Sequence, residues 1–295
     1  MYVRFKKRLG YVLIAPSAVV ILAVLFYPLI YSAYLSAFET YVGPGRLILR
    51  FIGFKNYLDV LSSPQWWLAF GRTSYLVLYD IVVGMSLGLG IALLLTKRSR
   101  FTGIGRALVL FPYVLPSIVR ALMWKWIYNS NYGFLNGLLF RLGIIKDYIA
   151  WLSHTTLALH MLIVANLWEG TPFAIIMYLA ALQTIPQELY DAARVDGATS
   201  WQTFAKVTFP LLKPMTYILI VMKTVATFKV FDLVYALTSG GPGSSTQVVG
   251  FLMYSTVFDS LQFGKGAAMS YITLVVIFGL VIVYTRLFGT GGERA

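Results

Sequence analysis

Residues 184–214, TIPQELYDAARVDGATSWQTFAKVTFPLLKP, decide how this chain is organised. The segment carries carboxylates at Glu188, Asp191 and Asp196, whereas the runs before and after it are apolar and long enough to cross a bilayer. A polar, helix-forming segment between two such runs must lie outside the membrane. We therefore interpret it as a docking surface for a soluble protein.

The composition indicates that lipid is the main solvent of the chain. Of 295 residues, 59% are hydrophobic and 12% are charged, against about 25% charged residues in soluble domains. Lys and Arg gather at the ends of apolar runs, which is typical of orientation at a membrane and not of nucleic-acid binding. The absence of cysteine excludes disulfides and thiolate metal sites. The sequence has no nucleotide-binding GxxxxGK[ST] motif, and we expect no cleavable signal peptide.

Six apolar runs are candidates for membrane-spanning helices, each of which needs roughly 20 residues. Because the runs lack the alternation of membrane strands, we predict an all-α membrane protein with a single domain, 1–295, and a core at 67–289. Residues 184–214 would form a helix–turn–helix between the fourth and fifth spans. The six predicted spans are 9–33, 67–96, 104–128, 155–183, 212–238 and 267–289.

Basic residues outside the predicted spans or near their ends predict the orientation in a cell membrane. Lys and Arg favour the cytoplasmic side, so the richer side should hold both termini and residues 184–214. That side has Arg4, Lys6, Lys7, Arg8, Lys97, Arg98, Arg100, Arg106, Arg194, Lys206, Lys213, Arg286 and Arg294. The outer side has Arg46, Arg50, Lys55, Arg72, Arg141, Lys146 and Lys265.

On the outer side, FIGFKNYLDVL at 51–61 is predicted to be a helix lying along the membrane interface. Gly84 and Gly88 have the spacing of small residues that lets two helices pack closely. Tryptophans expected in the interfacial belt are Trp66, Trp67, Trp124, Trp126 and Trp151.

Polar residues inside predicted spans are costly and are functional candidates. They are Asp80, Asn166, Glu169, Lys223 and Asp232. The functional interpretation is that they face a hydrated path for a solute. For Asp80, an ion pair with a base on another helix is an equal alternative, and Lys223 could instead extend to the interface. A proton relay is not favoured, since the histidines are only His154 and His160.

The segment 184–214 carries signals for two capped helices. Thr184–Gln187 has the spacing of a capping box, and Gly197 is expected to end the first helix with a positive φ. Thr199–Gln202 repeats the capping box, and the second helix should stop before Pro210. The alternative to docking is that both helices pack beneath the bundle.

The same residues carry a family resemblance. The chain has Asp191–Ala193, then Gly197 after three residues and Val207–Pro210 after nine more. This pattern resembles the EAA loop of ATP-binding-cassette (ABC) importer permeases, Glu-Ala-Ala-x3-Gly-x9-Ile-x-Leu-Pro. LTSGGPGSST at 237–246 and FIGFKNY at 51–57 are similar to the carbohydrate-uptake branch, which includes maltose-type and glycerol-3-phosphate-type permeases. The resemblance covers nearly the whole chain. It departs at Asp191, where the family has Glu.

The resemblance implies the permease of an ATP-driven sugar importer that works by alternating access. It implies three kinds of partner: a second homologous permease, a cytoplasmic ATPase dimer and an extracytoplasmic solute-binding protein. ATP and Mg would be held by the ATPase, so this chain would have no enzyme activity, cofactor or metal of its own. The residues implied to couple the chain to the ATPase are Glu188, Asp191, Ala192, Ala193, Gly197 and Pro210.

The resemblance also implies a sugar site, since Asn166–Phe173 matches a run that lines the site of maltose-type permeases. A second set of lining positions is aligned through Gly240–Pro242. The implied substrate-binding residues are Asn166, Gly170, Phe173, Lys223, Ala226, Thr227 and Val230. Several Asn residues of the second set are absent, so the ligand could differ or the partner permease could carry the site.

Two other functions stay open at this point. One is an importer of glycerol-3-phosphate or another anionic solute, which Lys223 and the outer basic residues favour. The other is a secondary transporter or membrane scaffold that needs no ATPase.

Overall fold

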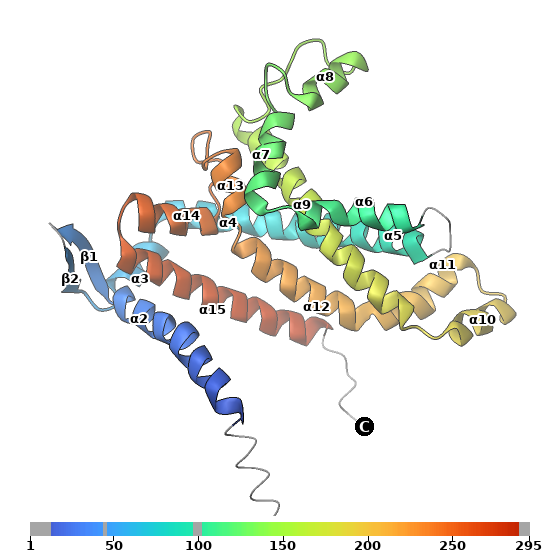
Figure 1. Ribbon diagram of the computed structural model, residues 1–295, viewed down its shortest axis with the longest axis horizontal. Coiled ribbons are helices and arrows are strands. Elements are labelled where there is room, and N and C mark those ends of the chain that lie inside the picture. The colour runs from blue at the N-terminus through green and yellow to red at the C-terminus, as the bar shows by residue number, and fades with distance from the viewer. Residues whose placement is uncertain (1–12, 44–45, 97–101, 289–295) are drawn as a thin grey trace, which may run out of the picture. The chain divides into compact units, whose positions relative to one another are not determined.

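The computed structural model describes residues 13–43, 46–96 and 102–288 (Figure 1). The chain divides into two compact units, Met1–Pro64 with Met253–Leu274 and Gln65–Leu252 with Val275–Ala295. Several basic residues used to predict the orientation lie outside the described ranges: Arg4, Lys6, Lys7, Arg8, Lys97, Arg98, Arg100 and Arg294.

The prediction of an all-α membrane protein is confirmed. Among the described residues, five helices are long and apolar enough to cross a membrane, and a sixth span results if two sharply bent helices count as one. The five helices are Leu13–Ser36, Pro64–Thr96, Thr155–Gln183, Ser200–Phe228 and Phe263–Phe288. The bent pair, Gly103–Val114 with Ser117–Ile127, turns by 101°. Pro116 causes this break, since proline disfavours a helical conformation of the residue before it and cannot donate a hydrogen bond.

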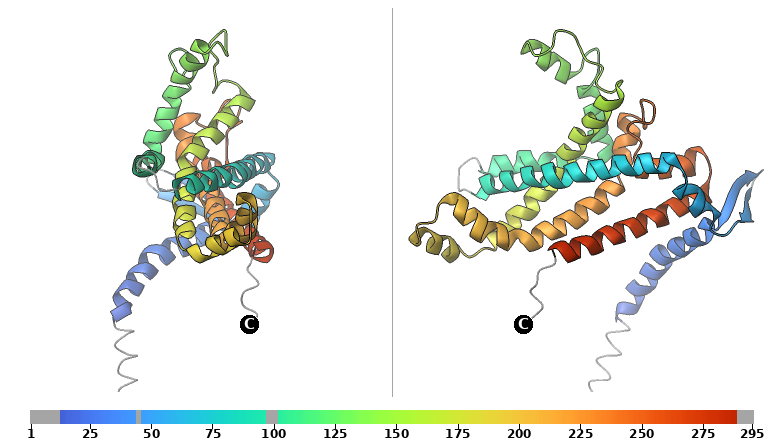
Figure 2. Two further views of the ribbon diagram at one scale, coloured as in Figure 1. Left: turned by 90° about the vertical axis from the view of Figure 1, so that its right-hand side faces the viewer. Right: turned by 180° about the vertical axis from the view of Figure 1, so that it is seen from behind.

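The second unit is a set of helices packed around α9 (Figure 2). Its helices are α4 (Pro64–Tyr79), α5 (Met85–Thr96), α6 (Thr102–Val114), α7 (Ser117–Ile127), α8 (Phe134–Arg141), α9 (Thr155–Gln183), α10 (Gln187–Val195), α11 (Ser200–Thr203), α12 (Phe209–Phe228) and α13 (Asp232–Leu237). Two π-helical segments, Asp80–Gly84 and Phe204–Thr208, join α4 to α5 and α11 to α12. Helices α8 and α10 lie near opposite ends of α9 (Figure 1).

Close packing of α5 on α9 depends on Gly88. A Cβ atom at this position would lie 2.8 Å from the Cβ of Ala174 on α9. The predicted small-residue spacing of Gly84 and Gly88 therefore serves contacts within this chain. Trp66, predicted for the interfacial belt, is instead 1% exposed, because it lies on the inward face of α4 with Ala69 and Thr73.

The segment after α9 corrects three predictions. Thr184 does not cap α10, because its hydroxyl donates to the carbonyl of Ala181 at the end of α9. The second helix does not stop before Pro210, since Ser200–Phe228 is continuous. The π-helical turn just before Pro210 places the proline in the first turn of α12, where its missing N–H is tolerated. The fifth span is accordingly 200–228 and not 212–238, and α13 is a separate helix.

The first unit combines α2 (Tyr27–Ser36), which the π-helical segment Leu22–Phe26 precedes, with an antiparallel hairpin and α3 (Lys55–Leu61). The hairpin pairs β1 (Phe38–Gly43) with β2 (Arg46–Phe51). The predicted helix at 51–61 is thus correct only in its second part. Helix α3 begins at Lys55, whereas residue 51 ends β2 and residues 52–54 connect the strand to the helix. After residue 248 come α14 (Val249–Tyr254), the π-helical segment Ser255–Asp259 and α15 (Phe263–Phe288). Helices α14 and α15 each contain residues of both units.

Candidate solute cavity and coupling segment

A cavity of about 520 Å³ opens beside α9 and α12 in the second unit. This volume lies within the usual range for small-molecule sites. One wall is the apolar face of α12, and polar groups come from α7, α9 and the α12–α13 junction. The lining residues are Ser117, Asn166, Glu169, Val221, Met222, Val225, Ala226, Lys229, Val230, Phe231, Asp232 and Leu233.

Some polar side chains of the cavity already have an ion-pair or hydrogen-bond partner in this chain, and others have none within the described ranges. Arg120 forms an ion pair of 2.5 Å with Glu169, and the hydroxyl of Ser117 donates to Oδ2 of Asp232 at 3.0 Å. The side chains of Asn166 and Lys229 make no hydrogen bond or ion pair within the described ranges. The cavity therefore offers a free amide and a free ammonium beside two carboxylates, a set that can bind hydroxyl groups.

The bend between α6 and α7 positions Arg120. Its Nη1 donates to the carbonyl of Pro112 at 3.2 Å, and its Nη2 meets Glu169 of α9. Arg120 thus joins α6, α7 and α9 on the side of the cavity where Glu169 lies.

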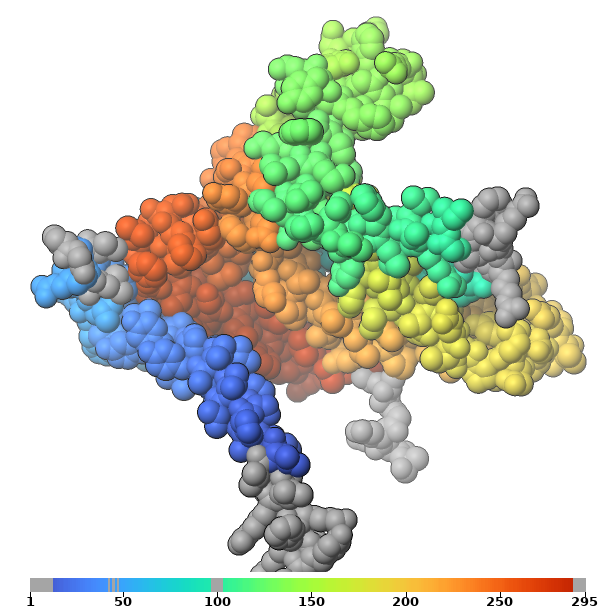
Figure 3. Space-filling view, in the orientation of Figure 1, coloured from blue at the N-terminus to red at the C-terminus, as the bar shows by residue number. Residues whose placement is uncertain are grey.

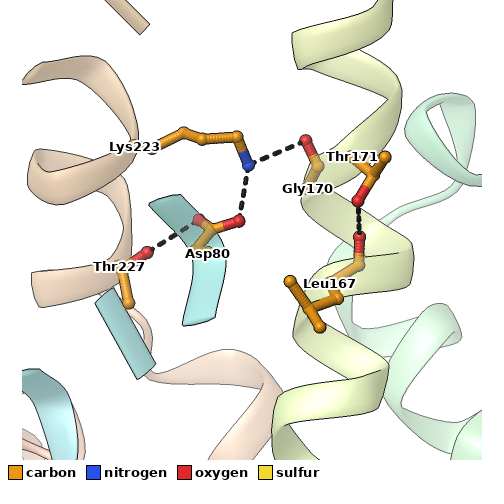
Figure 4. Close-up of polar contacts among 6 residues, drawn as sticks. All are labelled: Asp80, Leu167, Gly170, Thr171, Lys223 and Thr227. Atoms are coloured by element: carbon orange, nitrogen blue, oxygen red, sulfur yellow. Dashed lines mark hydrogen bonds and ion pairs between the residues drawn. The ribbon is translucent and has the colours of Figure 1, made fainter. Parts of the chain in front are cut away.

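A buried polar cluster joins three helical segments: Asp80–Gly84, α9 and α12 (Figure 4). Nζ of Lys223 donates to Oδ1 of Asp80 at 2.5 Å and to the carbonyl of Gly170 at 3.2 Å. The hydroxyl of Thr227 donates to Oδ2 of Asp80 at 3.1 Å. Asp80 and Lys223 are each 4% exposed. The structure therefore corresponds to the ion-pair alternative for Asp80, and Lys223 does not extend to the interface.

Two glycines make room for the ion pair. A Cβ atom at Gly84 would lie 2.8 Å from Oδ1 of Asp80 and 3.1 Å from the side chain of Leu167. A Cβ atom at Gly170 would lie 3.2 Å from Nζ of Lys223. A side chain at Gly84 would therefore displace the carboxylate or separate α9 from the Asp80–Gly84 segment.

The structure divides the implied substrate-binding residues into three groups. Asn166, Ala226 and Val230 line the cavity. Gly170, Lys223 and Thr227 belong to the buried polar cluster. Phe173 lies elsewhere, where its ring stacks on Tyr113 of α6 at a centroid distance of 6.1 Å.

Sequence reasoning missed Ser117, Lys229 and the apolar wall of α12. The wall has a recognisable signal, because Met222 and Val225 lie on the face of α12 away from Lys223 and Thr227. No sequence signal connects Ser117 to this site, since the bend of α6 against α7 brings it there.

The segment that follows α9 is exposed where docking was predicted (Figure 3, yellow). No residue of α10 is buried, and Val195 and Trp201 are 88% and 73% exposed. Gly197 follows α10 with φ +71°, and the second capping box, Thr199 with Gln202, is confirmed. The alternative that α10 packs beneath the bundle is therefore not what the structure shows.

The implied coupling residues are mostly accessible. Glu188, Asp191, Ala192 and Gly197 are exposed, whereas Ala193 and Pro210 are half-buried. Asp191 forms a surface ion pair of 2.9 Å with Arg194. Such a pair contributes little to stability, so its carboxylate stays available to a partner.

Comparison with known families identifies the class of protein. The profile of the family described as "Binding-protein-dependent transport system inner membrane component" matches residues 82–289. The chain belongs to this family. It is a membrane-spanning ABC importer permease, and this family consists of transport proteins and not of enzymes.

Relatives of this permease match nearly all of its length. The trehalose/maltose transport system permease protein of Thermococcus litoralis is 34% identical over 284 residues, which cover 96% of this chain and 94% of that protein. The sulfoquinovosyl glycerol transport system permease protein of Agrobacterium fabrum is 32% identical, with 96% and 91% covered. A crystal structure of a bacterial ABC transporter for the acidic polysaccharide alginate matches with a TM-score of 0.83 at 22% identity, covering 98% of this chain and 97% of that one. This last likeness concerns the fold alone.

Proposed function

We propose that this permease carries a saccharide across the cell membrane through the cavity between α9 and α12. The observation that carries the proposal is the lining of that cavity, where the free Asn166 amide and two carboxylates lie beside an apolar wall. Sugars present hydroxyl groups and apolar ring faces, and this lining matches both. The similarity to a trehalose/maltose permease supports the same solute class.

The proposed transporter contains a second permease, a cytoplasmic ATPase pair and an extracytoplasmic solute-binding protein. ATP and Mg would be bound by the ATPase, and this chain would contribute the path and the coupling surface. The excess of basic residues on the side of α10 supports a cytoplasmic location of that helix and of both termini. Alternating access would then open the cavity to each side in turn.

The proposed coupling surface is the exposed segment formed by α10, Gly197 and α11. A polar segment outside the membrane that exposes Val195 and Trp201 has the composition of a protein interface. Glu188, Asp191 and Ala192 would contact the ATPase directly.

An acidic solute is the second candidate. The residue that supports it is Lys229 and not Lys223, from which the sequence-based hypothesis started. Lys223 is not available to an anion, because Asp80 and the Gly170 carbonyl already surround its ammonium group. Lys229, which lines the cavity and is exposed, favours an acidic saccharide instead. Membership of a binding-protein-dependent family argues against the secondary transporter and scaffold alternatives.

Filling the cavity should stop transport without preventing assembly. We expect Ala226→Trp to lower saccharide uptake into proteoliposomes by about tenfold or more, since the indole would occupy the solute space. Ile218→Trp is the matched control, because Ile218 is an exposed residue of α12 outside the cavity. Trehalose, maltose and an alginate oligosaccharide are the probes, each presented with the binding protein of the system. Wild-type uptake of all probes by Ala226→Trp would contradict the assignment of the cavity.

The charge of the solute is tested separately with Lys229→Gln. If the solute is acidic, this variant should lose uptake of the alginate oligosaccharide while uptake of maltose is unaffected. Equal uptake of the acidic probe by wild type and variant would count against the second candidate.

A further inference from the structure

The charged side chains that line the cavity of the second unit do not balance one another. They are Glu169 of α9, Lys229 at the end of α12 and Asp232 of α13. Within the described lining, negative charge therefore exceeds positive charge. Such a lining would repel the carboxylate groups of an acidic saccharide and would attract cations.

Arg120 of α7 supplies a further positive charge next to this lining. Its Nη2 forms an ion pair with Oε1 of Glu169 at 2.5 Å, and its side chain is 11% exposed against 25% for Glu169. Among the described residues, Arg120 does not belong to the cavity lining. It therefore acts on a solute through its electric field and through Glu169, and its burial limits the screening of that field by water and salt.

Contacts on both sides hold Arg120 in this position. Its Nη1 donates to the carbonyl of Pro112 on α6 at 3.2 Å, while its Nη2 meets α9. The first turn of α7 is attached to α13, because the hydroxyl of Ser117 donates to Oδ2 of Asp232 at 3.0 Å. The guanidinium group is therefore held between α6, α7 and α9 and is directed at Glu169.

Neither the buried polar cluster nor the second acid of the lining supplies another compensating charge. Asp80 and Lys223 form their own ion pair, so this pair carries no net charge. Asp232 accepts its hydrogen bond from Ser117, an uncharged residue, and keeps its negative charge. With Arg120 the site has two acids and two bases, and without it the acids are in excess.

We propose that Arg120 is a specificity-determining residue of this cavity. It cancels the charge of Glu169 without touching the solute, so that the cavity does not favour cations over acidic saccharides. The inference rests on the proposed function, because it assigns the solute to the cavity between α9 and α12. It deepens that function by naming a positioning residue, outside the lining, that controls which solute charges the site accepts.

The chain contains no cysteine, which permits a direct measurement of the charge in the cavity. Ala226→Cys places one thiol at an exposed position of the lining. Two methanethiosulfonate reagents of similar size probe it, one with a trimethylammonium group and one with a sulfonate group. The ratio of their reaction rates, cationic over anionic, follows the local potential and needs no transport. The rates are read from the mass of this chain in the complete reconstituted transporter.

Arg120→Gln in the Ala226→Cys background should raise this ratio about tenfold, because the charge of Glu169 is then uncompensated. Arg120→Lys keeps the charge and should stay within about threefold of the starting ratio. Arg120→Gln combined with Glu169→Gln removes one charge of each sign and should stay within about twofold. Lys213→Gln is the matched control, since Lys213 is an exposed base of α12 outside the cavity. It should change the ratio by less than about twofold.

An unchanged ratio in Arg120→Gln, or an equal rise in Lys213→Gln, would overturn the inference. A residue that only joins α7 to α9 would leave the ratio unchanged. Should Arg120→Gln not assemble, Glu169→Gln applies the same test with the opposite sign, and the ratio should fall about tenfold.

The proposed function fails in a different way in the same experiment. If the cavity is the solute site, saccharide delivered by its loaded binding protein should slow the reaction of the thiol in Ala226→Cys with both reagents. Reaction rates that saccharide does not change would overturn the assignment of the cavity, whatever the effect of Arg120→Gln on the ratio.

Discussion

Lys223→Met is expected to reduce the amount of folded permease in membranes by more than about tenfold. The substitution leaves the Asp80 carboxylate buried at the middle of the span Pro64–Thr96, where it keeps one hydrogen bond, from Thr227. Removing one partner of a buried ion pair costs about 3–5 kcal/mol, because the remaining charge is neither solvated nor paired. Fluorescence-detected size-exclusion chromatography and the thermal unfolding midpoint of the solubilised protein measure the effect.

The double variant Asp80→Asn with Lys223→Met should recover most of this loss. Asn and Met keep the approximate shapes of the two side chains, and removal of both charges leaves no uncompensated ion in the interior. Lys213→Met is the matched single control, since Lys213 is an exposed residue of the same helix. It should have an effect of less than about 0.5 kcal/mol.

Transport by the double variant separates two roles of Lys223. If the ion pair only positions α9, α12 and the Asp80–Gly84 segment, transport returns with assembly. If Lys223 binds the solute, the double variant assembles but does not transport. A double variant as unstable as Lys223→Met would show that the ion pair is not what holds these helices together.

Gly197→Leu is expected to lower recovery of the ATPase with this permease by more than about tenfold, while the permease itself folds. Gly197 has φ +71°, and a Cβ atom there meets no other atom of this chain within 4 Å. The cost to the isolated permease is therefore only the backbone strain of about 1–2 kcal/mol. The larger loss arises because the leucine side chain would occupy space that the ATPase needs.

Gly143 provides a control that matches Gly197 in conformation. It follows α8 with φ +69°, and a Cβ atom there also meets nothing within 4 Å. Gly143→Leu should therefore carry the same strain, yet α8, which Gly143 follows, lies near the end of α9 opposite α10 (Figure 1). Equal loss of the ATPase in both variants would assign the effect to folding and not to docking.

Local features of this fold were predictable from the sequence, since neighbouring residues determine them. The capping box of Thr199 and Gln202 and the positive φ of Gly197 need only a few adjacent residues. The prediction at Thr184 was wrong because the preceding helix uses that hydroxyl first, and the one at Pro210 because a π-helical turn accommodates the proline.

The candidate site was only partly predictable, because its contacts join distant residues. Asp80 and Lys223 are 143 positions apart, and a buried ion pair has no signature that identifies its two members among the basic residues of other helices. The same holds for Arg120 and Glu169, which the bend at Pro116 brings together. The hairpin was missed because its two short strands lie outside the apolar runs that guided the prediction.

We propose that this permease transports a saccharide and that the segment 184–214 couples this transport to ATP hydrolysis. The most direct measurement is solute-stimulated ATP hydrolysis by the reconstituted transporter, with its sugar-loaded binding protein, in wild type, Gly197→Leu and Gly143→Leu. We predict stimulation in wild type and in Gly143→Leu and its loss in Gly197→Leu. Full stimulation in Gly197→Leu would contradict the proposal that this segment couples transport to ATP hydrolysis.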